Sequence, residues 1–411
     1  MSNTSLIASS ERVLADLNAL RAIGAYKTGV HKPTFSDAHM RSLVWLTEKL
    51  PDAGLTGAID GIGNVIGVSS KSGAKLLAGS HLESQNHAGW LDGPLGVIYA
   101  LEAARVINAD PFISGAVEVA AWCDEEGHFG HFLGSRSYVG LVSDADIDAA
   151  RDRTSGKSMR DALRDVGLSD RVRIVTQPGR HVGYLEAHIE QGDLLESSGL
   201  AVGVVTSIVG IWQYRISFEG EQNHAGTTRM AARKDAGLAL AKFCVAIDTH
   251  FPAACGPRTV WTTGRIALDP GAPSIIPGRA EMLFQIRDDD SAAIDRLEAL
   301  LHAMAGEVTA AGPCRVTVER IRNGAPARMD SAFQEEIEAA SQVFADGKSI
   351  RMPSGAGHDA QMLATVMPAG MLFVPSIGGI SHHWTENTTD ADIVRGAQVF
   401  VEACRRILVQ K

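Results

Sequence analysis

The order of the expected strands and helices changes near residue 211, and this change narrows the choice of folds. In the first half, short apolar strands at 75–80 and 117–123 flank an expected helix at 94–108. Such alternation is typical of an α/β fold, in which helices cover a mostly parallel sheet. Because the pattern breaks off and later returns, we expect one α/β domain that is interrupted by a second domain.

The inserted segment has its own order of elements. Its expected order is strand, helix, strand, strand, helix, strand, at 211–218, 232–249, 258–267, 279–287, 291–311 and 314–320. This β-α-β-β-α-β order is the ferredoxin-like pattern, and the segment 264–278, rich in Pro and Gly, is expected to hold the central turn. The α/β pattern then resumes with a helix at 330–345, a strand at 370–375 and a helix at 392–408. We therefore expect a catalytic domain at 1–210 and 325–411, and an inserted domain at 211–324.

Composition excludes several classes of function. The 411 residues carry a formal net charge of −10 without a basic run, which argues against binding to nucleic acid or to an anionic membrane. The five cysteines are widely spaced and form no C-x-x-C pair, so a cytoplasmic setting is expected and a thiolate zinc site is not. Residues 1–20 are predicted to form an amphipathic helix and not a signal peptide, and no apolar run is long enough to span a bilayer.

Polar residues gather where the strands of the first half end. His81 directly follows the first strand, and Asp92 lies just before the helix. The second strand leads into three consecutive acids, Asp124, Glu125 and Glu126. Burying such like charges costs several kcal/mol each unless a cation is present. A solvated acidic loop explains the three acids alone, but a bound cation better explains all five residues.

Two later histidines complete the candidate site. His188 lies in the segment LEAHIEQG, and His382 follows the strand at 370–375 in a glycine-rich turn. Any one of the chain's 14 histidines is more often a core or surface residue than a ligand. Imidazole and carboxylate without cysteine suit zinc, manganese, cobalt or nickel, and a metal pair needs a bridging carboxylate. The sequence thus predicts a site for two divalent metal ions.

Eight motifs in order carry a resemblance to a known family. GSHLES, LDGPLG, DEEG, LGSRSYVG, HIEQG, NHAGTTRM, SGAGHDA and GISHHWTEN resemble the hydantoinase/carbamoylase-type amidases of the M20 metallopeptidase superfamily. That group includes N-carbamoyl-L-amino-acid hydrolases, allantoate amidohydrolases and β-ureidopropionases. The resemblance implies an α/β catalytic domain, whose mixed sheet is covered by helices, and an inserted ferredoxin-like lid that also forms a homodimer.

The resemblance implies the ligands of each metal ion. His81 and His188 would bind one ion, Glu126 and His382 would bind the other, and Asp92 would bridge both. The number of ligands suits a dinuclear centre that activates water.

Further roles follow from the same resemblance. Glu125 would be the general base, and His224 would reach across the homodimer to stabilise the oxyanion. Arg287 would hold a substrate carboxylate, although on its own it also fits a solvated charge at a strand end. The stretch 354–359 is expected to line the pocket. The expected substrate-binding residues are Gln191, His224, Ser274, Arg287, Gly355 and Ala356.

Five positions depart from the family pattern. Glu83 stands where an aspartate usually orients the first histidine, and Ser274 stands where an asparagine often helps to hold the carboxylate. Arg229 replaces a common proline, and His383 and Trp384 replace small residues or proline. These changes leave the metal positions intact but alter the pocket wall, so the reaction type is better determined than the substrate.

The leading hypothesis is hydrolysis of an N-carbamoyl-L-amino acid to the L-amino acid, CO2 and NH3, by a metal-bridging hydroxide with Glu125 as general base. The alternatives are an allantoate or ureido-acid amidohydrolase, an N-acyl or conjugated amino acid amidohydrolase, a peptidase, and a non-catalytic binding protein on the same fold. Trp90, Trp384, His87 and His128 are candidates for shaping the pocket, and packing is the alternative role of the two tryptophans.

Overall fold

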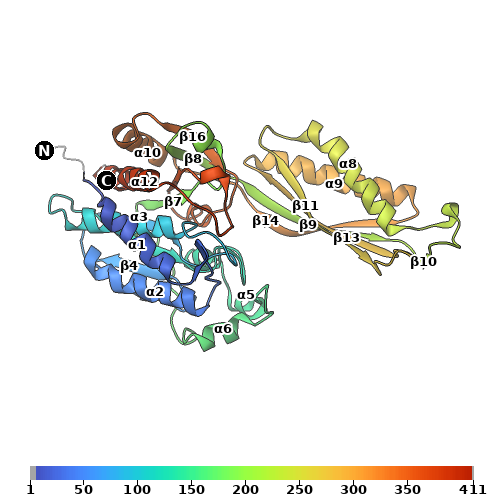
Figure 1. The fold of residues 1–411 in the computed structure, drawn as a ribbon, viewed down its shortest axis with the longest axis horizontal. Coiled ribbons are helices and arrows are strands. Elements are labelled where there is room, and N and C mark those ends of the chain that lie inside the picture. The colour runs from blue at the N-terminus through green and yellow to red at the C-terminus, as the bar shows by residue number, and fades with distance from the viewer. Residues whose placement is uncertain (1–5, 410–411) are drawn as a thin grey trace. The chain divides into compact units, whose positions relative to one another are not determined.

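The computed structural model describes residues 6–409, which form two compact units (Figure 1). The first unit comprises Met1–Thr206, Arg328–Ser354 and His358–Lys411, and the second comprises Ser207–Ala327 with Gly355–Gly357. Each unit has its own hydrophobic core, as expected for separately packed bodies.

The first unit is built on a nine-stranded mixed sheet. Its strand order is β15-β8-β17-β7-β5-β6-β4-β3, and β16 pairs with β8. The strands are β3 (Leu55–Ile59), β4 (Val65–Ser69), β5 (Lys75–His81), β6 (Ala116–Trp122), β7 (Gly183–Ile189), β8 (Val202–Ile208), β15 (Ala327–Arg328), β16 (Ser349–Ser354) and β17 (Ala369–Val374).

Only the centre of this sheet is parallel. β17, β7, β5 and β6 are neighbours and run in parallel, whereas β4 pairs with β6, β3 with β4, and β8 with β17 in antiparallel fashion. The mixed sheet that the family resemblance implied is therefore confirmed. The mostly parallel sheet expected from the apolar pattern is found only in the centre, because that pattern did not reveal the outer strands. The central strands were predicted because they are buried on both faces, which gives continuous apolar runs.

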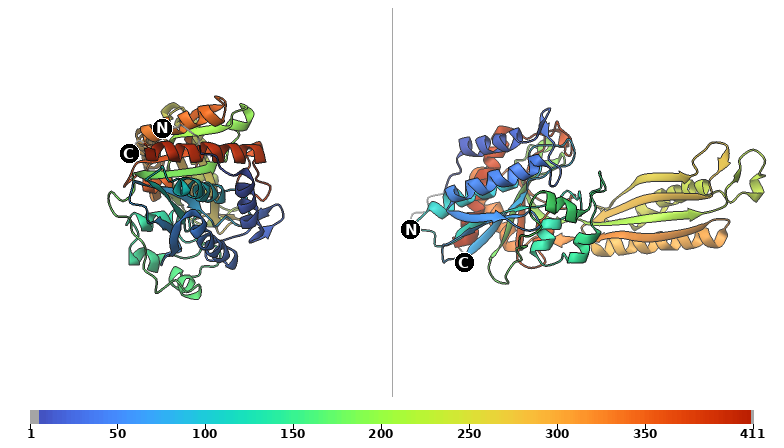
Figure 2. Two further views of the ribbon diagram at one scale, coloured as in Figure 1. Left: turned by 90° about the vertical axis from the view of Figure 1, so that its left-hand side faces the viewer. Right: turned by 90° about the horizontal axis from the view of Figure 1, so that it is seen from below.

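Helices cover both faces of the sheet (Figure 2). α3 packs on β5, β6 and β7 and is itself contacted by α1 and α12, while α11 and α4 contact β7, β17 and β6. α3 begins at Pro94, in the first turn where a missing N–H costs nothing. The helices are α1 (Ser10–Ala22), α2 (Asp37–Lys49), α3 (Pro94–Ala109), α4 (Leu133–Tyr138), α5 (Asp144–Ala149), α6 (Met159–Asp165), α7 (Leu194–Ser197), α10 (Ser331–Phe344), α11 (Ala360–Leu363) and α12 (Asp390–Val409).

The N-terminal helix is shorter than predicted. Of the segment 1–20, residues 1–5 lie outside the described part of the chain, and the helix α1 begins only at Ser10. The helix begins there because Ser9 is its N-cap: the Ser9 side chain accepts a hydrogen bond from the backbone N–H of Arg12. Along residues 6–409, no helix is both long and apolar enough to cross a membrane.

The second unit is a four-stranded antiparallel sheet with two helices. Its strand order is β11-β13-β9-β14, and the elements follow one another as β9, α8, β11, β13, α9 and β14. Alternate residues of β9 and β13 are buried, which places one face of the sheet against α8 and α9. The elements are β9 (Gly210–Glu219), β10 (Asn223–His224), α8 (Ala236–Ala254), β11 (Val260–Asp269), β12 (Ile275–Ile276), β13 (Arg279–Asp288), α9 (Ser291–Ala311) and β14 (Arg315–Gly324).

Candidate metal centre

The candidate ligands lie at one edge of the central sheet. His81 is the last residue of β5, His188 is the last but one of β7, and Glu126 lies in the turn after β6. Because these strands are parallel neighbours, their carboxyl ends meet, and α/β sheets place ligands at this edge. His382 arrives on the irregular segment after β17, the strand beside β7.

Asp92 lies between two groups of potential ligands. Its Oδ1 is 3.0 Å from Nε2 of His188 and 3.6 Å from Nε2 of His81. Its Oδ2 is 3.3 Å from Nε2 of His382, whose ring nitrogen is also 3.6 Å from Oε2 of Glu126. In each group the possible ligand atoms lie within 4.8 Å of one another. One carboxylate thus offers a separate oxygen to each group, which is the arrangement that a pair of cations requires.

The charge in this cluster is unusual for a protein interior. Burial tends to raise the pKa of Asp92, but hydrogen bonding to His188, His382 and His81 holds it well below its usual range. Burial raises the pKa of Glu125, and the neighbouring Glu126 adds to this effect. Carboxylates crowded in this way favour a cation among them, so the donor set fits divalent metal ions.

Glu125 is placed to act beside the cluster. Its carboxylate oxygen Oε2 lies 3.9 Å from Nε2 of His81, and its side chain is only 12% exposed. Its backbone N–H donates to Oε1 of Glu83 at 2.6 Å, which holds the turn after β6 in place. The family departure at Glu83 therefore keeps a carboxylate in contact with this turn, and its Oε1 also lies 3.7 Å from Nδ1 of His81.

Asp124, the first of the three consecutive acids, has a different role. Its carboxylate accepts hydrogen bonds from Oγ1 of Thr34 and from the backbone N–H groups of His128, Phe129 and Gly130. Burial raises its pKa to about 7. Asp124 thus anchors the loop after β6, a role that the sequence did not distinguish from metal binding.

Sequence reasoning assigned no role to three polar residues that support the ligands. Gln85 donates from its backbone N–H to Oε1 of Glu126 and from its side-chain amide to Oε2. Glu386 accepts the backbone N–H of Asp92, and Ser381 donates to Oδ2 of Asp92. Their nearness to His81 and His382 in the sequence was a weak signal, because only the fold shows where their side chains point.

Gln191 was expected to contact the substrate. Its side-chain amide donates to Oδ2 of Asp92 at 3.1 Å and to Oγ of Ser381 at 3.1 Å. The structure therefore places Gln191 beside the candidate metal ligands.

Two residues at this edge have a strained backbone. His382 and Gln191 have φ angles of 55° and 60°, in the left-handed region that side chains with a Cβ rarely adopt. Gly93 has a φ of 87°, and a Cβ there would lie 2.5 Å from the ring of His81. Such strain persists where the surrounding structure holds it, and it is common at functional sites.

The remaining predicted site residues lie in the second unit. His224 is exposed on β10, and the backbone N–H of Ala225 donates to the carbonyl of Ser274. Arg287, near the end of β13, is partly buried and donates to the backbone carbonyl of Gly355 at 2.8 Å. Ala356 belongs to the same unit.

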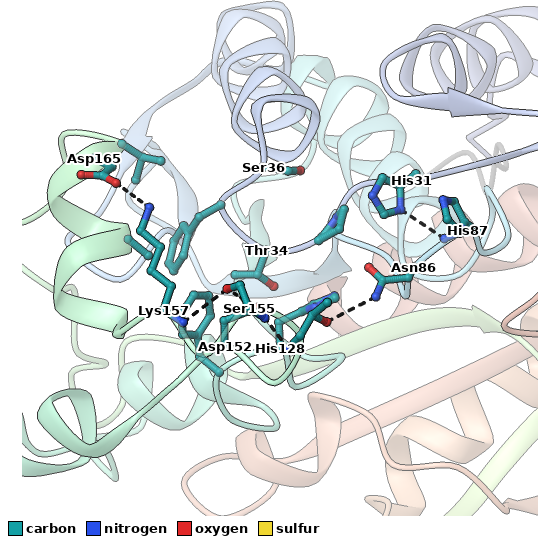
Figure 3. A pocket seen from close by; sticks show the side chains of 16 residues that line it. His31, Thr34, Ser36, Asn86, His87, His128, Asp152, Ser155, Lys157 and Asp165 are labelled. Carbon is teal, nitrogen blue, oxygen red and sulfur yellow. Dashed lines mark hydrogen bonds and ion pairs between the residues drawn. The ribbon is translucent and has the colours of Figure 1, made fainter.

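A separate cavity of about 580 Å³ lies in the first unit (Figure 3). His31, His87 and His128 line it together with Asp152 and Lys157, whereas none of the predicted metal ligands does. His87 stacks on His31 with ring centroids 4.5 Å apart. His87 and His128 thus line a cavity that contains no predicted metal ligand. This cavity does not support the expectation that they shape the substrate pocket.

The two candidate tryptophans differ in exposure. Trp90 is buried in the core and donates from Nε1 to Asn387 at 3.3 Å, so it is a packing residue. Trp384 is only partly buried, and Nζ of Lys27 lies 4.2 Å from its ring centroid.

Comparison with known proteins places the chain in a family. The model of peptidase family M20/M25/M40 matches residues 75–406. An N-carbamoyl-L-amino acid amidohydrolase of Geobacillus stearothermophilus is 33% identical, over 95% of this chain and 96% of its own length. An allantoate amidohydrolase of Bacillus subtilis is 31% identical, over 91% of this chain and 92% of its own.

The solved structures agree with this assignment. The crystal structure of a hydantoinase/carbamoylase-family amidase from Burkholderia phymatum has a TM-score of 0.89 and 42% sequence identity, and covers 99% of this chain and 100% of that chain. The chain therefore belongs to peptidase family M20/M25/M40 and is an amidohydrolase of the hydantoinase/carbamoylase type, which acts on C–N amide bonds.

Proposed function

We propose that the protein hydrolyses N-carbamoyl-L-amino acids to the L-amino acid, CO2 and NH3, with two divalent metal ions in each subunit. The observation that carries this proposal is the pair of oxygens of Asp92, which face His81 and His188 on one side and His382 and Glu126 on the other. The substrate class is supported by the similarity to an N-carbamoyl-L-amino acid amidohydrolase along nearly the whole chain.

The five residues would hold the two ions through one shared carboxylate. When bound, such ions lower the pKa of a water molecule towards neutrality and polarise the substrate carbonyl. The residues fit this role because zinc, manganese, cobalt and nickel all accept imidazole and carboxylate ligands.

Glu125 moves the protons in the proposed reaction. Its carboxylate accepts a proton from the attacking water and returns it to the leaving nitrogen. The position of its Oε2, 3.9 Å from the His81 ring, supports this role because it lies beside the cluster without being one of the shared ligands. Its partial burial raises its pKa, which makes the carboxylate a stronger base.

His224 has the chemistry of an oxyanion donor. Its Nδ1 accepts the backbone N–H groups of Gly226 and Thr227 at 3.0 and 3.2 Å, so Nδ1 carries no proton in the neutral ring. The proton is therefore on Nε2, and the ring is exposed. We propose that the segment 211–324 is a ferredoxin-like lid and dimerisation domain, and that His224 of the partner subunit stabilises the developing negative charge.

Arg287 fits the recognition of a substrate carboxylate. Its guanidinium donates to the side-chain oxygen of Gln285 and to the carbonyl of Gly355, within residues 6–409 it forms no ion pair with an acid, and burial lowers its pKa. A partly desolvated guanidinium without a carboxylate partner attracts one from a ligand, which it holds in a bidentate geometry. Gln191, Ser274, Gly355 and Ala356 remain proposed contacts of the substrate, and the cytoplasm remains the expected location.

An allantoate or ureido-acid substrate is the second candidate. It is favoured by the similarity to an allantoate amidohydrolase and by the departures at Ser274 and Trp384, which alter the proposed pocket wall. The two candidates differ in the group that flanks the scissile bond, and not in the reaction.

The test is ammonia release from a panel of substrates. Protein loaded with Mn²⁺ or Zn²⁺ is offered N-carbamoyl-L-amino acids, allantoate, other ureido acids and N-acyl amino acids, with Glu125→Gln as the matched control. Because an N-acyl amino acid releases a carboxylic acid and no ammonia, its turnover is followed by the amino acid that is set free. We expect the N-carbamoyl-L-amino acids to give the highest kcat/KM, and a chelator to stop the reaction. A higher kcat/KM with allantoate or an N-acyl compound contradicts the proposed substrate, and no turnover of any compound contradicts the proposed reaction.

A further inference from the structure

A fully buried histidine lies next to Glu83, close to the candidate metal centre. His39 is on α2, has no exposed surface, and packs with its ring near Phe35. Its ring atom Nε2 lies 3.7 Å from Oε2 of Glu83, which is equally buried. Within residues 6–409 neither of these two atoms has a hydrogen-bond partner. Buried polar atoms are rarely left in this state, so the pair calls for an explanation.

The tautomer of His39 follows from its other ring nitrogen. Nδ1 accepts the backbone N–H of Phe35 at 3.1 Å, so Nδ1 carries no proton. Burial lowers the pKa of His39 to about 4, so the ring is neutral and its single proton is on Nε2. This N–H points to the Glu83 carboxylate as the acceptor that it faces. Shortening the distance by about 0.7 Å gives an ordinary N–H···O hydrogen bond.

Glu83 connects His39 with the working part of the site. Its Oε1 accepts the backbone N–H of Glu125 at 2.6 Å and that of Glu126 at 3.4 Å. The same oxygen lies 3.7 Å from Nδ1 of His81, and this ring nitrogen is hydrogen-bonded at 3.1 Å to the backbone carbonyl of Glu83. One carboxylate therefore contacts a proposed ligand and the turn that carries the proposed base, and its second oxygen is turned towards His39.

We propose that His39 is a positioning residue, whose Nε2–H fixes the Glu83 carboxylate. It thereby fixes the turn at Glu125 and Glu126, and also residue 83, whose backbone carbonyl orients the His81 ring. An aspartate at position 83 is one methylene shorter, so we expect it to reach either the turn at Glu125 and Glu126 or His39, but not both. The glutamate at this position and the histidine on α2 therefore act together as a pair. This inference rests on the proposed function, because it assigns to Glu83 the support of a metal ligand.

Two substitutions separate the functions of the two ring nitrogens. In His39→Asn the side-chain oxygen can replace Nδ1 as acceptor for Phe35, but no donor reaches Glu83. In His39→Gln the longer amide can replace Nε2 as donor. We expect His39→Asn to weaken the binding of Zn²⁺ and Mn²⁺ by about 10- to 100-fold, measured by competition with a chromophoric chelator, and His39→Gln to restore much of the loss. Equal affinity of His39→Asn and the wild type overturns the proposal.

A double-mutant cycle tests whether His39 acts through Glu83. If it does, His39→Asn added to Glu83→Asp weakens metal binding no further than Glu83→Asp alone, because the connection is already broken. Additive losses in affinity overturn the proposal, since they show that His39 acts by another route.

His181→Asn is a matched control. His181 is also buried against a carboxylate, with Nε2 2.9 Å from Oε2 of Glu118, but it precedes β7, at the opposite end of that strand from His188. We expect this variant to lose thermal stability and to keep the wild-type metal affinity. An equal loss of affinity in His181→Asn and His39→Asn overturns the proposal. A wild-type protein that binds no divalent ion instead contradicts the proposed function, so the two failures are distinguishable.

Discussion

Replacing Asp92 by asparagine tests whether one carboxylate serves both ion sites. Asparagine has nearly the same shape but removes the charge, and only one of its two side-chain positions remains an acceptor. Because Oδ1 faces His188 at 3.0 Å and Oδ2 faces His382 at 3.3 Å, the substitution affects both sites at once. A carboxylate that belonged to one site would affect one ion only.

The expected magnitude follows from binding linkage. An ion at 100 times its Kd stabilises the folded state by about 2.7 kcal/mol, so two independent sites give about 5 kcal/mol. Loss of an outer-shell partner alone weakens metal binding by about 10- to 100-fold, so we take about 100-fold for the loss of the Asp92 charge. The free ion is then at its Kd, and each site contributes only about 0.4 kcal/mol. At about 2 °C per kcal/mol, the ion-induced rise in Tm falls from about 10 °C to about 2 °C.

The assay is a thermal melt with and without Zn²⁺ at fixed free concentration, combined with metal analysis of the dialysed protein. His188→Ala and His382→Ala are the matched controls, because each removes a ligand from one group only. We expect each control to retain one ion and about half of the stabilisation, and Asp92→Asn to retain neither. If Asp92→Asn keeps both ions, or loses only one, the reasoning about a shared carboxylate is refuted.

Three further predictions concern catalysis, pH and stability. Glu125→Gln lowers kcat by about 10²- to 10⁴-fold without changing the metal content, and ammonia release together with metal analysis checks both results; an unchanged kcat contradicts the assigned role. Lys32 is buried, with Nζ bonded to a backbone carbonyl, and burial lowers its pKa to about 7. The unfolded chain therefore binds the additional proton between about pH 7 and pH 10, and the contribution of Lys32 to stability rises with pH in this window. In denaturant melts, the advantage of Lys32→Met over the wild type is about 3 kcal/mol greater at pH 6 than at pH 9, and a difference independent of pH contradicts the assignment. Asp16→Asn breaks the buried ion pair with Arg105 at 2.5 Å and lowers the free energy of unfolding by about 3 kcal/mol, and a loss below about 1 kcal/mol shows that the pair behaves like an exposed one.

The elements that the sequence predicted well are those with a strong local signal. The helix expected at 291–311 is found as α9 with these bounds, because Asp290 caps its first turn and Gly312 ends it. The strand expected at 75–80 is β5, one residue longer. β3, β4 and β8 were missed, because short strands whose pattern is set by their neighbours carry little signal of their own.

The candidate site was predictable in its residue types and not in its supporting contacts. Histidine and acidic residues after apolar strands could be expected to meet, because parallel strands share an edge. The different role of Asp124 could not be predicted, because it depends on the directions in which the side chains of Asp124, Glu125 and Glu126 point. The contact between His39 and Glu83 joins α2 to a distant turn, and no local pattern marks it.

The most direct test of the shared carboxylate is a crystal structure of the Zn²⁺-loaded protein, with data collected on both sides of the zinc absorption edge. The account predicts two anomalous peaks about 3.5–4 Å apart, one between Asp92, His81 and His188 and the other between Asp92, Glu126 and His382. A single peak, or peaks that make no contact with Asp92, contradicts the central claim.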